Sequence, residues 1–192
     1  MTQLILASSS PRRRDMLHAA GLTFELVVSP AEEIHDLNMP LQALCEENAA
    51  LKALSVSSDY PNAVVIGADT LVYIDQTPLG KPLDHVDAHA MLSRLSGRTS
   101  QVCTGVCLAC GVQSYRFHEI TEVLFKTLTP EVIDNYISKV NVMDKAGAYA
   151  VQEYGDMIIQ EVRGDYDNVV GLPVKKLLDK LNLIKSNGIT GF

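Results

Sequence analysis

The chain has 192 residues, of which 47% are hydrophobic, and a formal net charge of −7 at pH 7. That length is enough for one sizeable hydrophobic core, so we expect a single domain over residues 1–192. The acidic balance argues against binding to nucleic acid polymers or membrane surfaces, since both normally need a basic footprint, whereas a small phosphorylated ligand needs only local positive charge.

Residues 4–14 have the sequence LILASSSPRRR. The apolar residues ahead of the serines predict a buried strand, and Ser10 with the proline after it predicts the cap and first position of a helix. Arginines fill the first helical turn, where a cation is disfavoured by roughly 0.3–1 kcal/mol because the helix dipole is positive there. A bound polyanion would reverse this penalty, so we interpret Ser8, Arg12 and Arg13 as parts of a phosphate site. A solvated basic turn is the alternative.

The hydrophobic pattern of the remaining chain predicts alternating strands and helices. Strands are predicted over residues 23–28, 62–74, 99–112, 115–128 and 157–162. Helices are predicted over residues 41–55, from Asp84 to residues 95–97, from Pro130 to Lys139, and over residues 172–184. Loops or turns are predicted over residues 29–40, 75–78, 79–82, 144–152 and 163–171.

The run at residues 62–74 is apolar almost throughout, so we expect both faces of that strand to be covered. The two long consecutive strands in mid-chain imply antiparallel pairing in part of the sheet. The predicted fold class is therefore α/β or α+β, with helices around a long, twisted, mixed sheet.

No apolar run approaches the ~20 residues of a membrane span, and the first residues lack the order of a signal peptide. The four cysteines are too few and too clustered for a secreted disulfide framework, and the five histidines show no metal-ligand spacing. We therefore expect a cytoplasmic protein.

Asp69 lies inside the apolar run, in the segment GADT. Burying an unpaired carboxylate is costly, so Asp69 should have a partner, a metal or a perturbed pKa. The neighbouring Gly67 and Ala68 would let another group approach the backbone closely. Asp69 is thus a candidate general base or metal ligand, and the alternative is a carboxylate paired with a structural basic group or capping a loop.

Lysines and acidic residues elsewhere offer further contacts to a phosphorylated ligand. Lys81 lies on a stiff LGKP loop and Lys52 on a predicted helix, and either suits a point contact to phosphate. Glu32 or Glu33, together with Asp69, would suffice for Mg²⁺, which typically takes one or two carboxylates plus substrate phosphates. Each of these residues is equally consistent with a solvated side chain.

Five short motifs occur in order along the chain: SSSPRRR, GADT, LGKP, DKAGAYAVQ and VVGLP. In this order and spacing they resemble the Maf family of nucleoside triphosphate pyrophosphatases, from residue 4 to the C-terminal helix. The resemblance implies a long mixed sheet flanked by helices, with two lobes around a central cleft. It also implies hydrolysis of a nucleoside triphosphate between its α- and β-phosphates, with Mg²⁺ or Mn²⁺, in the cytoplasm. Family members are often homodimers, although no apolar stripe here predicts an interface.

The resemblance also implies roles for individual residues. Asp69 matches the family's proton acceptor. One of Glu32 or Glu33 matches an acidic position of the family's cleft, and we expect Glu33, with Asp69, to be the pair that would hold the metal. Arg12, Thr70 and Gln152 match positions that separate subgroups, and all three follow the dTTP/UTP-type branch rather than the 7-methyl-GTP-type branch. The basic positions of the family's cleft match Arg13, Lys52, Lys81 and Lys145.

Three hypotheses follow. The first is a metal-dependent pyrophosphatase that converts dTTP and UTP, and modified pyrimidine nucleotides, to the monophosphate and pyrophosphate. In it the Ser8 to Ser10 backbone, Arg12 and Arg13 hold phosphates, and Asp69 activates water. The second is the same chemistry on another nucleotide, such as 7-methyl-GTP. The third is a nucleotide-binding regulator of cell division with little turnover.

Overall fold

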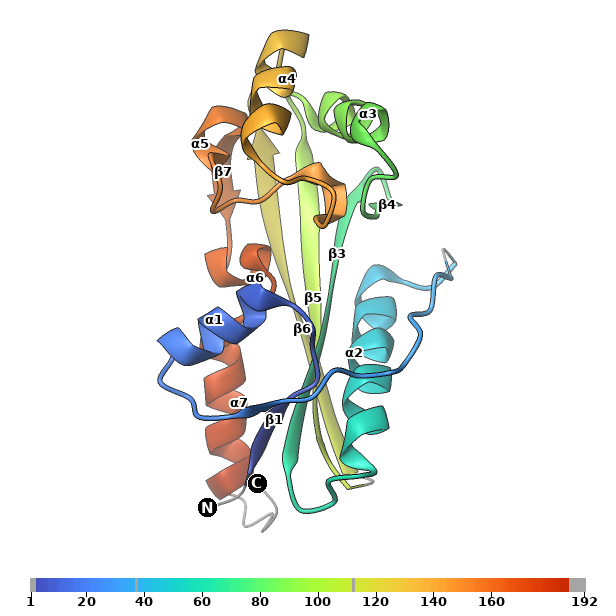
Figure 1. The fold of residues 1–192 in the computed structure, drawn as a ribbon, viewed down its shortest axis with the longest axis vertical. Helices are drawn as coiled ribbons and strands as arrows, with labels where there is room; N and C mark the ends of the chain where they lie inside the picture. The colour runs from blue at the N-terminus through green and yellow to red at the C-terminus, as the bar shows by residue number, and fades with distance from the viewer. Residues whose placement is uncertain (1–2, 37, 112, 187–192) are drawn as a thin grey trace. The chain divides into compact units, whose positions relative to one another are not determined.

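The structure is a computed structural model that describes residues 3–36, 38–111 and 113–186, and Figure 1 shows the course of the chain. The strands are β1 (Leu4–Leu6), β2 (Glu25–Leu26), β3 (Val64–Ile74), β4 (Thr77–Leu79), β5 (Thr99–Cys110), β6 (Gln113–Phe125) and β7 (Ile159–Arg163). The helices are α1 (Pro11–Ala19), α2 (Leu41–Ser57), α3 (His85–Leu95), α4 (Pro130–Lys139), α5 (Gly155–Ile158), α6 (Tyr166–Val170) and α7 (Val174–Ser186), with a short 3-10 helix η1 (Ala146–Ala148).

The described strands form one mixed sheet in the order β2-β1-β3-β5-β6-β7, and β4 pairs with β3. Strand β1 pairs in parallel with β2 and β3, whereas the β3–β4 and β6–β7 pairs are antiparallel. A mixed sheet flanked by helices confirms the predicted fold class.

The chain divides into two compact units. The first unit comprises the described residues within 1–69, 104–119 and 171–192, and the second comprises residues 70–103 and 120–170. The expectation of a single domain over the whole chain stays a prediction.

In the first unit, apolar side chains are buried on both faces of the sheet. On one face β1, β3 and β5 pack against α2, and Ile5 and Val65 are among the fully buried side chains. On the other face the next residues along the same strands, Leu6 and Ile66, pack with α1 and α7. Coverage of both faces explains the nearly continuous apolar sequence of β3 and confirms that expectation.

Two glycines let α2 approach the sheet at backbone distance. A Cβ on Gly67 would lie 2.2 Å from the carbonyl oxygen of Ala49 and 2.7 Å from the nitrogen of Ala53. A Cβ on Gly105 would lie 2.3 Å from the carbonyl carbon of Cys45. These contacts are too close for any side chain, so both strands need glycine here. The sequence predicts that Gly67 lets another group approach the backbone closely, and in the structure that group is helix α2.

The core of the second unit joins α3 and α4 to the sheet. Leu92 of α3 and Ile133 and Tyr136 of α4 are buried in one cluster with Phe125 and Tyr149. The rings of Phe125 and Tyr149 meet edge to face, with centroids 5.0 Å apart. This core fixes the segment that follows η1, because the hydroxyl of Tyr136 also bonds to the backbone there.

Some predicted boundaries are wrong in detail. The strand predicted at residues 23–28 is reduced to the two residues of β2. The turn predicted at 75–78 is tighter, because Asp75 and Gln76 both have positive φ (51° and 59°) and the chain returns at once as β4. Two such residues are what a two-residue hairpin turn requires.

The end of the chain shows two further differences. The strand predicted at residues 157–162 begins as helix, because Met157 and Ile158 belong to α5 and β7 starts at Ile159. Short apolar runs do not distinguish helix from strand. The loop predicted at 163–171 contains α6. Val112, the end of one predicted strand, lies outside the described residues.

Candidate active site

The serine loop leads into α1 as the sequence predicts. Ser10 is the N-cap, and its Oγ accepts a hydrogen bond from the backbone N–H of Arg13 at 3.5 Å. Ser8 is buried, and its Oγ accepts from the backbone N–H of Ser10 at 3.2 Å. The first turn of α1 contains no acidic residue. Its backbone N–H groups and arginines therefore make this helix start positive.

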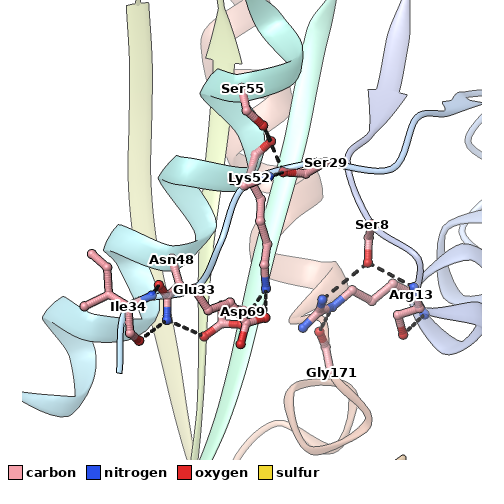
Figure 2. A network of polar contacts seen from close by, with 12 residues as sticks. Ser8, Arg13, Ser29, Glu33, Ile34, Asn48, Lys52, Ser55, Asp69 and Gly171 are labelled. Atoms are coloured by element: carbon pink, nitrogen blue, oxygen red, sulfur yellow. Dashed lines mark hydrogen bonds and ion pairs between the residues drawn. The ribbon is translucent and has the colours of Figure 1, made fainter. Parts of the chain in front are cut away.

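Arg13 joins the first sequence motif to the last. Its Nε donates to the carbonyl oxygen of Gly171 at 2.9 Å, and its Nη1 donates to Ser8 Oγ at 3.4 Å (Figure 2). Burial lowers the pKa of the Arg13 guanidinium, the carboxylate of Asp69 opposes that shift, and the charge of Arg12 adds to it. Arg13 thus lies within electrostatic reach of Asp69, and it holds the VVGLP segment beside the serine loop.

Asp69 is the buried carboxylate of the site, with 5% of its surface exposed. Its Oδ1 lies 2.7 Å from Lys52 Nζ, and its Oδ2 accepts a hydrogen bond from Asn48 Nδ2 at 3.3 Å (Figure 2). Lys52 Nζ also lies 2.7 Å from Glu33 Oε1. One ammonium therefore bridges two carboxylates. Of the alternatives that the sequence leaves open for Asp69, the structure shows a charged partner, and Glu33 is the acidic loop residue that contacts the same Lys52.

Sequence reasoning missed Asn48. This residue is almost fully buried in α2, one helical turn before Lys52, and both its oxygen and its nitrogen form hydrogen bonds. An asparagine within a predicted helix resembles any polar surface position. The signal that was available is its i, i+4 spacing from Lys52, which places both side chains on one helix face.

Lys145, in the second unit, is buried within its own loop. Its Nζ lies 2.6 Å from the carbonyl oxygen of Asn141, 2.9 Å from Asp144 Oδ1 and 3.3 Å from Glu153 Oε1. Since an ammonium has three hydrogens, the loop supplies one acceptor for each. A role for Lys145 at a phosphate stays a prediction.

The other predicted residues of the second unit lie on β3 and on two connected loops. Thr70 is half-buried in β3, directly after the buried aspartate. Lys81 is exposed after β4, and the backbone N–H of Gly147 donates to the carbonyl oxygen of Gly80 at 2.9 Å, which fixes that loop against η1. Gln152 follows η1 and is exposed.

Within the first unit the structure therefore gathers most of the predicted site: Ser8, Ser10, Arg12, Arg13, Glu33, Lys52 and Asp69. In the second unit it brings the loop of Lys81 against the segment that follows Lys145.

Two carboxylates are the donors that this site offers to a metal. Across the described residues, His, Cys, Asp and Glu form no group of three or more that could hold a metal ion. Mg²⁺, however, usually binds one or two carboxylates and completes its shell with phosphates and water. Asp69 and Glu33 fit such an ion if the substrate's phosphates share it.

A model of the Maf-like protein family matches residues 3–184, and the chain belongs to this family. Among its relatives, the dTTP/UTP pyrophosphatase of Akkermansia muciniphila is 50% identical over 179 residues, which cover 93% of this chain and 95% of that protein. The dTTP/UTP pyrophosphatase of Symbiobacterium thermophilum is 46% identical over 182 residues, 94% of this chain and 93% of that protein. The protein of the same name from Bacillus pumilus is 43% identical over 192 residues, the full length of both chains.

Among solved structures, the chain is similar to a nucleoside-triphosphatase / dITP/XTP pyrophosphatase from Mycobacterium abscessus. The identity is 14% and the TM-score 0.43, over 66% of this chain and 75% of that chain. At this level the likeness supports no statement about the site.

One further finding concerns membranes. Within the part of the chain that the structure describes, none of the helices has both the length and the apolar character needed to cross a bilayer.

Proposed function

We propose that this protein hydrolyses dTTP and UTP to the nucleoside monophosphate and pyrophosphate. The observation that carries the proposal is the cluster in which Lys52 bridges Asp69 and Glu33, within electrostatic reach of the half-buried Arg13. The choice of substrate is supported by relatives named dTTP/UTP pyrophosphatase, which match at least 93% of the chain at 50% and 46% identity.

Hydrolysis adds water across the α–β phosphoanhydride. A water oxygen bonds to phosphorus, the bridging oxygen leaves with its electron pair, and the water gives up a proton. Asp69 is the proposed acceptor of that proton, because it is a buried carboxylate that Lys52 and Asn48 hold in place. Lys52 and Arg13 would offset the negative charge that grows in the transition state.

The start of α1 is the proposed phosphate cradle. The serine loop from Ser8 to Ser10, together with Arg12 and Arg13, would hold the phosphate groups through backbone N–H groups, hydroxyls and guanidinium groups. The positive end of the α1 dipole favours an anion at the same place. An incoming triphosphate would thus meet the arginines that the helix start otherwise disfavours.

Asp69 and Glu33 would hold a divalent cation, Mg²⁺ or Mn²⁺, together with the substrate phosphates. When bound, such an ion neutralises phosphate charge and lowers the pKa of a coordinated water. Lys52 contacts both carboxylates at 2.7 Å, so a bound ion would compete with this side chain for them, and a phosphate oxygen would be a new partner for the ammonium.

The remaining assignments belong to the same proposal. Thr70 and Gln152 would help to select the base, and Lys81 and Lys145 would add positive charge near the phosphates. The protein would act in the cytoplasm, and a homodimer is the proposed assembly.

The test is pyrophosphate release measured with dTTP, UTP, 7-methyl-GTP and the common nucleotides. We expect the highest kcat/KM for dTTP and UTP. A preference for 7-methyl-GTP would identify that nucleotide as the substrate in place of dTTP and UTP. Tight triphosphate binding by calorimetry without product would indicate a binding protein instead of an enzyme.

Asp69→Asn should lower kcat by roughly 10²–10⁴-fold, the usual contribution of a positioned acid or base. Asp134→Asn, which changes an exposed carboxylate on α4, is the matched control and should leave kcat unchanged. Wild-type turnover in Asp69→Asn would exclude Asp69 as the proton acceptor.

A further inference from the structure

Asn48 uses both of its amide hydrogens and its amide oxygen for hydrogen bonds inside the first unit. Its Oδ1 accepts from the backbone N–H of Ile34 at 2.7 Å, and its Nδ2 donates to the carbonyl oxygen of Ile34 at 3.1 Å. The same Nδ2 donates to Asp69 Oδ2 at 3.3 Å (Figure 2). An amide nitrogen has two hydrogens, so one serves the loop backbone and the other serves the carboxylate.

These partners fix the orientation of the amide. The backbone N–H of Ile34 can only donate, so the oxygen of Asn48 must face it. A reversed amide would direct that oxygen at the carbonyl of Ile34 and at the carboxylate of Asp69, and all three contacts would become repulsive. Asn48 therefore has one orientation in which every partner is satisfied.

The result is a connection between two parts of the chain that carry the acidic groups. Glu33 directly precedes Ile34, so the clamp of Asn48 on Ile34 fixes the loop that presents Glu33. Lys52 makes a parallel connection one helical turn later, where its ammonium joins the carboxylates of Glu33 and Asp69. One face of α2 thus holds both carboxylates at two points.

We propose that Asn48 is a positioning residue for hydrolysis, which sets the separation and orientation of the carboxylates of Asp69 and Glu33. This inference rests on the function proposed above. An asparagine that only anchored the loop would need its two bonds to Ile34. The third bond occupies one oxygen of Asp69 and leaves the other directed at Lys52, so the carboxylate cannot rotate without losing a partner.

The test compares Asn48→Leu with a matched control, Asn168→Leu. Leucine has the same number of side-chain heavy atoms as asparagine, branches at the same carbon, and forms no side-chain hydrogen bond. Asn168 is also fully buried, but it lies in the second unit, where its Nδ2 donates to Val102 and Thr121 at 3.0 Å each. Both variants should lose stability, and only Asn48→Leu should lower kcat, by about 10–100-fold, with KM for dTTP changed less than about threefold.

A crystal structure of Asn48→Leu provides a readout that does not depend on activity. We expect the carboxylates of Glu33 and Asp69 to move apart or to rotate, so that their oxygens shift by about 1 Å, the scale of misplacement that impairs a reaction. If both carboxylates keep their places, or if kcat falls equally in Asn168→Leu, the inference is overturned. Asn48→Ser, which is smaller and polar, replaces Asn48→Leu if the latter does not fold.

The two proposals fail in different ways. If the wild-type protein releases no pyrophosphate from any nucleotide, the proposed function is refuted, and the crystal structures alone decide whether Asn48 positions the carboxylates. If the wild type is active and Asn48→Leu keeps its full kcat, the function stands and the role of Asn48 is refuted.

Discussion

A buried carboxylate needs compensation, and Asp69 obtains it from a single helix. Both of its oxygens have donors from α2, an ammonium on one side and an amide on the other. Removing one partner of such a group costs far more than the pair itself contributes, because the remaining charge stays buried. The carboxylate of Glu33 is partly solvated, so Lys52 matters to it less.

Lys52→Met should therefore destabilise the protein by roughly 3–5 kcal/mol and make its stability depend on divalent ions. Without the ammonium, Asp69 and Glu33 face each other as like charges, and an added divalent cation would take the position of Nζ. Thermal unfolding with and without Mg²⁺ checks this. Addition of Mg²⁺ should raise the Tm of Lys52→Met more than that of the wild type.

Lys176→Met is the control for this experiment, because Lys176 Nζ pairs with Glu119 at 2.8 Å on a more exposed surface. Its Tm should respond to Mg²⁺ as the wild type does. An equal response in Lys52→Met would contradict a shared place for the ammonium and the ion.

Part of this site could be predicted from the sequence on physical grounds. A carboxylate inside an apolar run must have a partner, so a partner for Asp69 was predictable, as was the cap by Ser10. The choice between Glu32 and Glu33 was not, because a loop has no periodicity to fix its register. Asn48 escaped prediction because its burial depends on how closely α2 approaches the sheet.

Helix α2 carries both Asn48 and Lys52, and its distance from the sheet is set by glycine. Gly67 lies two residues before Asp69, on the same face of β3. The helix backbone at Ala49 and Ala53 occupies the space where a side chain on Gly67 would be. The same glycine therefore determines how near the polar groups of α2 come to the carboxylate.

Gly67→Ala should shift α2 outward and lower both stability and turnover. The new Cβ would meet backbone atoms at 2.2 and 2.7 Å, which cannot move without the helix. We expect a loss of about 1–3 kcal/mol in urea unfolding, the usual cost of overpacking, and a fall in kcat. Gly80→Ala, with nothing within 4 Å of its Cβ, should change stability little. Equal stabilities of the two variants would contradict the glycine contact.

At the level of elements, prediction succeeded where caps and long patterns agree. Helix α4 begins at Pro130, as predicted, with Thr129 as its cap, and β3 follows the long apolar run. Prediction failed for β4 and α6, which have three and five residues. Elements this short form because tertiary pairing holds them, and their own sequence carries too little periodicity to reveal them.

At the scale of the whole molecule, several buried phenol and thiol groups stay neutral in the folded protein to a higher pH than in the unfolded chain. Burial raises the pKa of Tyr136 to about 12 and that of Cys107 to about 11, and it also raises the pKa of Tyr149. Tyr136 and Tyr149 belong to the core of the second unit, and Cys107 belongs to a core of the first. Each of these cores therefore loses stability in alkali for the same reason.

The sign of the effect follows from proton linkage at Tyr136. The phenol of a solvated tyrosine has an ordinary pKa of 10.0, whereas burial raises the pKa of Tyr136 in the folded protein to about 12. Below about pH 10 the phenol is neutral in both states, and its full contribution to stability is present. Between these values only the unfolded chain releases the proton, so stability falls as pH rises, by roughly 3 kcal/mol in total.

Tyr136→Phe removes this titration together with the hydrogen bonds that the hydroxyl makes to Ala150. At pH 7 the variant should be less stable than the wild type by about 1–3 kcal/mol, because the backbone of Ala150 loses its partner. Between about pH 10 and 12 its stability should fall less steeply, so the two curves converge. Urea unfolding across this range measures both slopes. Tyr166→Phe, at an exposed position, is the control and should keep the wild-type slope. If Tyr136→Phe also kept the wild-type slope, the buried phenol would not be the cause of the loss of stability in alkali.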